Sequence, residues 1–436
     1  MVHFMMAQKS RIRRRAALGL IGGALVASCQ SQPAAKAVAA ASPPPAPPPE
    51  PAPTVVLSSE NFARWLEGVR AEAAKRGISD GTIRAALDNL QPVPRVVELD
   101  RRQPEFTQTF SRYVNNAVNA KRIADGRAML AQHAGLLAAL ERDYNVQGRF
   151  LVAFWGMETN YGRVMGDFSV IAALATLAFD GRREAFFRDE LFKTLTILEK
   201  GHISLSRMKG SWAGAMGNTQ FMPTTFLRHA VDRDGDSHID IWGSLPDALA
   251  SAANYLHSMN WDGEGTWGRE VKLPRGFDIG LSSLDVDAKE DIRPLPAWAA
   301  LGVRRVDGGP LPNRDIPASL VLPQGVEGPA LLVYENYRTI LKWNRSAFYA
   351  IAVGHLADRF TGGEAMTNLA IGAEPLRRQD VVTLQEGLIA QGFLKGTADG
   401  VMGSGTRQAI RRYQLARGLP PDGYPGRPLL AAIMGA

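Results

Sequence analysis

The chain has 436 residues, of which 45% are hydrophobic and 21% are charged. These proportions are ordinary for a globular protein, so they exclude a chain that is disordered throughout. The length predicts two or three domains. The net charge is +7, but residues 1–28 carry five basic residues and no acidic one, which leaves the rest of the chain close to neutral. Nucleic-acid binding therefore lacks electrostatic support, and we expect no nucleic-acid partner.

Residues 1–28 have the pattern of an export signal. Their basic residues precede Ala16–Ala27, an apolar run of 12 residues that is too short to span a bilayer and has the length of a signal's apolar region. Arg13 and Arg14 offer a weaker, twin-arginine interpretation of the same segment. We predict an exported protein.

Cys29 is the only cysteine of the chain, which excludes an intrachain disulfide and a cysteine-rich metal site. The sequence Val26-Ala27-Ser28-Cys29 resembles the lipobox of bacterial lipoproteins, which implies cleavage after residue 28 and lipidation of Cys29. Gln30 and Ser31 then indicate the outer membrane, with the protein anchored in the periplasm. The alternative is a simple cleaved signal with an incidental cysteine.

Residues 29–57 are rich in proline and alanine, with nine prolines between Pro33 and Pro53. Such a segment cannot bury a core, and it predicts a semi-rigid tether between the lipidated cysteine and the folded part of the chain.

From Ser58 onward the pattern turns helical, beginning with a capping sequence and apolar residues at helical spacing. Further amphipathic stretches lie at 79–90, 104–120, 122–131, 134–144, 185–200 and 245–258, and strand patterns at 270–273, 319–322 and 331–334. We therefore predict a mainly α (α+β) body over residues 58–366, with a small β-containing insertion near 265–335. A second unit of three short helices is predicted over residues 374–436.

Glu158 is the candidate catalytic residue. In a helix it shares a face with Leu151, Phe154 and Trp155, and a lone carboxylate on an apolar stripe is costly to bury. Desolvation favours the protonated form and should raise the pKa, as a general acid at neutral pH requires. The alternative is a structural glutamate that is held by an arginine or by backbone amides.

Three blocks of sequence resemble the lytic murein transglycosylases of the membrane-bound B type. The blocks are Trp155 to Gly166 (WGMETNYGRVMG), Lys209 to Pro223 (KGSWAGAMGNTQFMP) and Asp247 to Leu256 (DALASAANYL). The resemblance extends over residues 58–366 and implies a lysozyme-like fold.

The resemblance implies that Glu158 protonates the glycosidic oxygen between N-acetylmuramic acid and N-acetylglucosamine. The carboxylate then accepts the proton of the muramic acid 6-hydroxyl, and a 1,6-anhydro sugar forms. The substrate supplies the nucleophile at high effective concentration, so a second enzyme carboxylate is not required. The resemblance further implies substrate-binding roles for Ser211, Gln220, Tyr255, Asn344 and Tyr349.

Trp343 departs from the family pattern, because relatives often carry tyrosine at this position. A hydrogen bond from a phenol is therefore lost here, and the role of the position is open.

Residues 232–240 form an acidic segment, DRDGDSHID. Carboxylates at loop positions 1, 3 and 5 (Asp232, Asp234 and Asp236) and a backbone carbonyl at position 7 (His238) are typical oxygen ligands of Ca²⁺. Glycine and glutamate are missing from standard positions 6 and 12, but the B-type family resembles the chain in this and uses a later aspartate, a role that Asp247 fits. We expect a structural Ca²⁺ site and no catalytic cofactor. The alternative is a solvated acidic turn.

Residues 399–414 (DGVMGSGTRQAIRRYQ) resemble the signature of a small helical peptidoglycan-binding domain. Leu384, Leu388, Ala409, Ile410 and Tyr413 are predicted to form its core. Such a domain would keep the catalytic cleft near the insoluble polymer.

The sequence therefore predicts a lytic transglycosylase whose partner is peptidoglycan, with other cell-wall enzymes as possible partners. Two alternatives stay open at this point: a muramidase-type hydrolase on the same fold, and a non-catalytic lipoprotein that binds the cell wall.

Overall fold

The computed structural model describes residues 58–101, 108–369 and 374–435. Most of these residues are helical and the sheet is small, which confirms the predicted mainly α class. The predicted signal, Cys29 and the tether lie outside the described residues. Within the part of the chain that is described, no helix combines the length and the apolar character that a membrane span requires.

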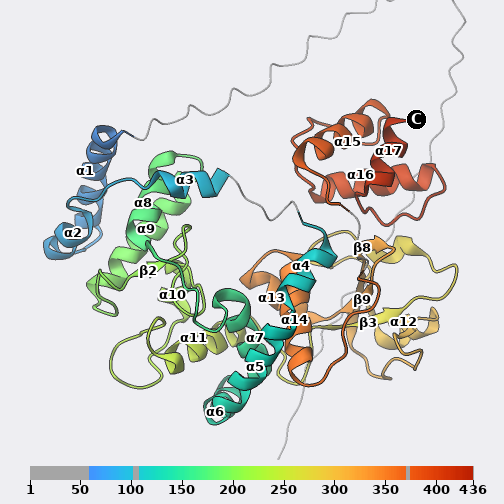
Figure 1. Cartoon of the computed structure of the whole chain (residues 1–436), viewed down its shortest axis with the longest axis horizontal. Coiled ribbons are helices and arrows are strands. Elements are labelled where there is room, and N and C mark those ends of the chain that lie inside the picture. Colours follow the sequence, from blue (N-terminus) through green and yellow to red (C-terminus); the bar gives the residue numbers. More distant parts are fainter. Residues whose placement is uncertain (1–57, 102–107, 370–373, 436) are drawn as a thin grey trace, which may run out of the picture. The chain divides into compact units, whose positions relative to one another are not determined.

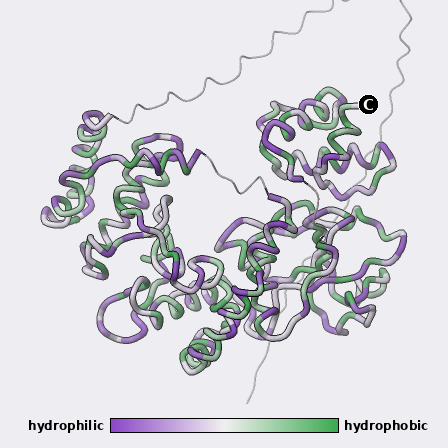
Figure 2. Tube along the Cα trace, in the orientation of Figure 1, coloured by the Kyte–Doolittle hydropathy of each residue, from purple (hydrophilic) through white to green (hydrophobic). Residues whose placement is uncertain are grey.

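The first helix begins where the capping sequence predicts. The Ser58 Oγ accepts a hydrogen bond from the backbone N–H of Asn61 at 3.2 Å, and Phe62, Leu66 and Val69 are buried along one face. The helices up to the sheet are α1 (Ser59–Lys75), α2 (Asp80–Leu87), α3 (Pro94–Arg101), α4 (Phe110–Ala117), α5 (Ala120–Gln132), α6 (Ala134–Tyr144), α7 (Gly148–Thr159), α8 (Val170–Asp180), α9 (Glu184–Glu199), α10 (Pro223–His229) and α11 (Leu245–Ser258). Figure 2 shows hydrophobic and hydrophilic residues along most of these helices, as amphipathic helices have, whereas nearly all residues of α8 and the middle of α7 are buried.

The sheet follows α11 in the chain, in the region predicted for the insertion. Its strands are β3 (Gly268–Lys272), β4 (Ser282–Ser283), β5 (Arg293–Pro294), β6 (Arg304–Arg305), β7 (Pro317–Val321) and β9 (Ala330–Val333), and β8 (Pro323–Val326) lies between the last two in sequence. The order is β4-β7-β9-β3-β6, with β5 also on β7, and only the β4–β7 pair of this described sheet is parallel. Leu295, Trp298, Leu320 and Leu332 belong to a separate apolar core that includes α12 (Leu295–Ala300).

Helix α7 lies at the centre of the main core. Its residues from Phe150 to Trp155 are all buried, and it packs against α5 and α14 (Ala347–Phe360), whereas α13 (Glu335–Trp343) contacts α14 (Figure 1). A helix that is apolar on every side is stable only inside a protein. The carboxyl group of Glu158, near the end of α7, is therefore positioned by a buried helix and not by a loop.

The C-terminal helices are α15 (Arg378–Ala390), α16 (Ser404–Ala416) and α17 (Arg427–Met434). The predicted core is confirmed, because Leu384, Leu388, Ala409, Ile410 and Tyr413 are each at most 2% exposed and share one apolar cluster.

Candidate active site

Glu158 lies in the last turn of α7, and the chain turns sharply immediately after it. Asn160, Tyr161 and Gly162 have positive φ values of 51°, 61° and 77°, so three consecutive residues take the left-handed conformation. Such a C-terminal turn ends the helix and satisfies its last carbonyl groups. The position of Glu158 is thus fixed by a helix on one side and a tight turn on the other.

Gly156 allows this turn to close against the helix. A Cβ atom at position 156 would lie 2.8 Å from the ring of Tyr161, which is closer than real Cβ atoms come. The Tyr161 ring packs edge-on against Trp155, with 5.7 Å between the ring centroids, and its hydroxyl donates a hydrogen bond to the Arg122 carbonyl at 2.6 Å. The Gly156 of the motif is therefore explained by packing.

Two side chains donate hydrogen bonds to the carboxyl group of Glu158, and both reach the same oxygen. The indole N–H of Trp343 donates to Oε1 at 2.8 Å, and the hydroxyl of Tyr349 donates a short hydrogen bond to Oε1. The phenol hydrogen bond that we expected to be lost at position 343 is replaced by a bond from the indole.

Burial raises the pKa of Glu158 to about 7, although the hydrogen bonds from Tyr349 and Trp343 act in the opposite direction. The carboxyl group also lies at the negative end of the α7 dipole, which disfavours its ionised form. The predicted rise of the pKa is confirmed, and its value suits a general acid at neutral pH. Burial, and next the charge of Glu158, raise the pKa of Tyr349 well above its usual range, so this phenol stays a donor.

Trp343 is held by other aromatic rings. The centroid of its ring lies 4.5 Å from that of Phe154, 5.1 Å from that of Tyr255 and 5.3 Å from that of Phe221. The hydroxyl of Tyr255 in turn donates to the backbone carbonyl of Lys342 at 2.8 Å. Tyr255 thus fixes both the ring of Trp343, which donates to Glu158, and the backbone of the residue before it.

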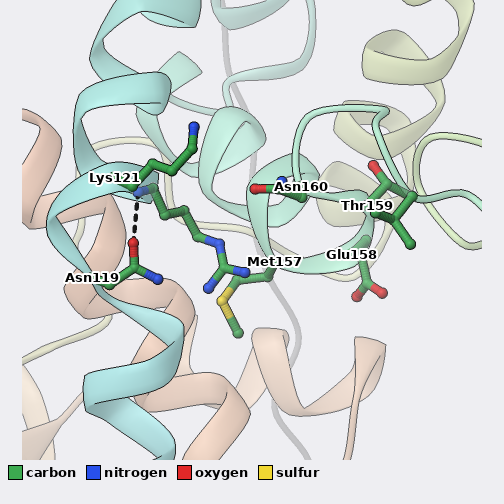
Figure 3. A pocket seen from close by; sticks show the side chains of 8 residues that line it. Asn119, Lys121, Met157, Glu158, Thr159 and Asn160 are labelled. Atoms are coloured by element: carbon green, nitrogen blue, oxygen red, sulfur yellow. Dashed lines mark hydrogen bonds between the residues drawn. The ribbon is translucent and has the colours of Figure 1, made fainter.

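A pocket of about 440 Å³ opens beside the carboxyl group. It is lined by Asn119, Lys121, Arg122, Met157, Glu158, Thr159, Asn160 and Val164. Figure 3 shows Glu158 at one end of the pocket, and Asn119 and Lys121 on the opposite side, at the start of α5. Glu158 supplies the single carboxyl group among these lining residues.

The other predicted substrate-binding residues lie in turns whose hydrogen bonds are local. The Ser211 Oγ accepts the N–H of Ala215 at 3.0 Å, and the Gln220 amide donates to the carbonyls of Met165 and Gly217, both at 3.0 Å. Asn344 follows the last residue of α13 and is partly exposed. Their contact with a sugar stays a prediction.

Asn218, which is not among the predicted site residues, joins the first sequence block to the second. Its Oδ1 accepts the indole N–H of Trp155 at 2.9 Å, and its backbone carbonyl accepts the hydroxyl of Thr159 at 2.9 Å. Its Nδ2 donates to the carbonyls of Ile241 and Trp242 at 3.1 and 3.0 Å. The position of Asn218 inside the second sequence block was the one feature of the sequence that could have indicated its role. The four residues to which it bonds are determined by the tertiary fold.

The acidic segment brings three of its predicted ligands together. Carboxylate oxygens of Asp232, Asp234 and Asp247 lie within 4.8 Å of one another, and Asp247 is completely buried. Burial raises the pKa of Asp247, against the effect of backbone N–H groups that hydrogen-bond to it. Asp236 and His238 are exposed and lie outside this cluster, with their side chains 3.7 Å apart. A hard cation fits the three converging carboxylates, since it would neutralise like charges around a buried group.

Comparison with known proteins matches two parts of the chain to known families. Residues 61–358 match the family described as Transglycosylase SLT domain, and residues 377–433 match Putative peptidoglycan binding domain. The chain is 32% identical over 253 residues to membrane-bound lytic murein transglycosylase B of Escherichia coli K12, and the aligned region covers 57% of this chain and 66% of that protein.

Two solved structures are similar to the chain as well. SltB3 of Pseudomonas aeruginosa, solved in complex with NAG-anhNAM-pentapeptide, has a TM-score of 0.82 and 46% identity, covering 86% of this chain and 99% of that chain. Slt35 of Escherichia coli, solved in complex with calcium, has a TM-score of 0.56 and 28% identity, covering 69% and 92% of the two chains. The chain therefore belongs to the Transglycosylase SLT domain family, as a lytic transglycosylase of the B type that carries a peptidoglycan-binding domain.

Proposed function

We propose that the chain cleaves the β-1,4 bond between N-acetylmuramic acid and N-acetylglucosamine in peptidoglycan and leaves 1,6-anhydromuramic acid ends. The observation that carries this proposal is the lone carboxyl group in the pocket, with a pKa raised to about 7. A hydrolase of the ordinary kind needs a second carboxylate across the scissile bond, to act on water or on the sugar.

Glu158 would act twice in one turnover. In the first half, its proton passes to the glycosidic oxygen as the bond to the anomeric carbon breaks. In the second half, the muramic acid 6-hydroxyl attacks the anomeric carbon and its proton returns to the carboxylate. The carboxyl group ends as it began, and water is not consumed.

The remaining predicted site residues fit supporting roles. Tyr349 donates to the carboxyl group, Tyr255 braces the ring of Trp343, and Ser211, Gln220 and Asn344 are proposed to contact the sugar from neighbouring turns.

The decisive experiment is mass spectrometry of the soluble products released from purified peptidoglycan. The expected muropeptides are lighter by one water than hydrolytic ones, and Glu158→Gln should lower their release by at least about 100-fold, the usual range for loss of an acid–base group. Reducing-end products would instead support a muramidase. Undiminished release by Glu158→Gln would refute the role of the carboxyl group.

We also propose a structural Ca²⁺ ion in the acidic segment. Asp232, Asp234 and Asp247 would supply carboxylate oxygens, and Asp236 and the carbonyl of His238 would complete the set as the loop pattern predicts. The ion would supply positive charge to two exposed carboxylates and the buried Asp247, and would take no part in the bond cleavage.

The anchor at Cys29 and the periplasmic location at the outer membrane are proposals from the signal pattern. The family of residues 377–433 supports a wall-binding role for the C-terminal helices, which would raise the concentration of the catalytic pocket near the polymer. Fractionation of cells that produce the wild-type chain and Cys29→Ala tests the anchor. Membrane association that survives this substitution would refute lipidation at Cys29.

A further inference from the structure

The hydrogen bonds at Glu158 are unequally shared between its two oxygens. In the part of the chain that the structure describes, the donors that reach this carboxyl group are the Trp343 indole and the Tyr349 hydroxyl, and both end on Oε1. A carboxyl oxygen has two lone-pair directions, and the two donors use both of them at Oε1. The proton of the neutral acid therefore belongs on Oε2.

We propose that Trp343 is a positioning residue that, together with Tyr349, fixes Oε1 of Glu158 as the acceptor oxygen and leaves Oε2 as the oxygen that transfers the proton. This inference rests on the proposed function. Oε2 gives its proton to the glycosidic oxygen as the bond from that oxygen to the anomeric carbon breaks. The 6-hydroxyl oxygen then bonds to the anomeric carbon, and its proton passes to Oε2.

An indole suits this task for a chemical reason. The N–H group of tryptophan is a donor only, whereas a phenol oxygen also accepts hydrogen bonds. A phenol at position 343 could accept the acidic proton of Glu158 and turn it away from the substrate. Trp343 cannot accept it, so position 343 offers the acidic proton no acceptor on the Oε1 side.

Packing holds the donor in place. Phe154, Tyr255 and Phe221 surround the Trp343 ring, and the hydrogen bond from Tyr255 to the Lys342 carbonyl fixes the backbone of the neighbouring residue. The ring therefore loses little freedom when it binds Glu158, because the fold has already ordered it.

The effect of Trp343 has a predictable sign. Hydrogen bonds to the carboxylate favour its charged form, so removal of the indole donor should raise the pKa of Glu158 from about 7. Glu158 must be protonated to act as the acid, so activity falls as the pH rises through its pKa. Loss of the donor should therefore move the basic limb of the pH–rate profile upward.

The other polar groups around Glu158 come from four elements. Tyr349 lies on α14, and an electrostatic interaction with Tyr113 of α4 contributes to the raised pKa of Tyr349, after burial and Glu158. Lys121 and Arg122 of α5 line the pocket, and His133 at the start of α6 contacts Trp155 of α7. Among the residues with described positions, Glu158 is the carboxyl group that the Trp343 indole touches, so a shift specific to position 343 reports on Glu158.

The matched variants are Trp343→Phe and Trp267→Phe. Both remove an indole that donates to a carboxylate at 2.8 Å, because Trp267 donates to Asp358 Oδ2. Initial rates of release of anhydro-ended products from soluble glycan strands are measured between pH 5 and pH 9. For Trp343→Phe we expect a basic limb about one pH unit higher, a ~10-fold lower kcat and a KM within about twofold. For Trp267→Phe we expect an unmoved basic limb, whatever its melting temperature.

An unmoved basic limb in Trp343→Phe, or an equal shift in Trp267→Phe, would overturn the inference. If Trp343→Phe does not fold, Tyr349→Phe removes the other donor to the same oxygen and should shift the limb in the same direction. Glu158→Gln separates the two proposals. If it stays active, the proposed function fails, and if it is inactive while the limb is unmoved, the assignment of the two oxygens alone fails.

Discussion

The raised pKa of Glu158 predicts that the catalytic carboxyl group destabilises the folded chain at neutral and alkaline pH. The pKa is about 7 in the folded chain and 4.5 in its ordinary state. The folded chain thus holds this proton more tightly than the unfolded chain does. The stabilisation that this proton gives to the folded chain is complete below about pH 4.5 and is lost as the pH rises through 7.

The size of the effect follows from the same two values. A difference of about 2.5 pKa units corresponds to roughly 3.5 kcal/mol, at about 1.4 kcal/mol for each unit. Glu158→Gln removes the titration but keeps a carbonyl oxygen that can accept from Trp343 and Tyr349. The free energy of unfolding of the variant should therefore rise, relative to that of the wild type, by up to about 3.5 kcal/mol between pH 4.5 and pH 8.

Urea denaturation of both proteins at pH 4.5, 6 and 8, followed by tryptophan fluorescence, measures this gain. The matched control is Glu67→Gln, because Glu67 lies on the exposed side of α1 and its surroundings change little on unfolding. Glu67→Gln should differ from the wild type by a constant small amount. A difference between Glu158→Gln and the wild type that does not grow with pH would show that the carboxyl group is not desolvated.

Three further changes test the structure around the site. Gly156→Ala should lower the activity and should also lower the free energy of unfolding by about 1–3 kcal/mol, because the new methyl group would lie 2.8 Å from the Tyr161 ring. The matched control is Gly135→Ala in an open part of α6, which should leave the free energy of unfolding unchanged or raise it in the same urea titration. Asn218→Ala should cost about 3 kcal/mol in urea denaturation, because the Trp155 N–H and the Trp242 carbonyl both lose their hydrogen bond to this side chain, while the Ile241 carbonyl keeps the backbone N–H of residue 218. Chelation should lower the melting temperature of the wild type, and Asp234→Asn should abolish this response to the chelator. If the wild type has the same melting curve with and without chelator, the calcium proposal is wrong.

The sequence was sufficient for features that depend on local pattern. Ser58 was predicted to cap the first helix, and the apolar residues around Glu158 predicted both a buried helix and a raised pKa. Each of these conclusions uses side chains within a few turns of one another, where helical spacing fixes the geometry.

Features that depend on contacts between distant residues cannot be predicted from local spacing. Trp343 is 185 positions from Glu158, and only the fold, which packs α14 against α7 and the Trp343 ring against Phe154, shows that its indole replaces a phenol. Likewise, loop spacing predicts Asp236 as a ligand and does not reach Asp247, which the family resemblance indicates and which the fold brings together with Asp232 and Asp234.

A path of hydrogen bonds and one peptide bond connects the acidic segment to the catalytic helix. The buried carboxylate of Asp247 accepts the N–H of Asp240 at 2.9 Å, and the carbonyl of the next residue, Ile241, accepts from Asn218. Asn218 in turn holds the Trp155 indole, one turn before the catalytic carboxyl group. A cation at the acidic segment would therefore affect the acid through the stability of these turns. For this reason chelation is expected to lower the melting temperature while the pH–rate profile keeps its basic limb at temperatures where the segment stays folded.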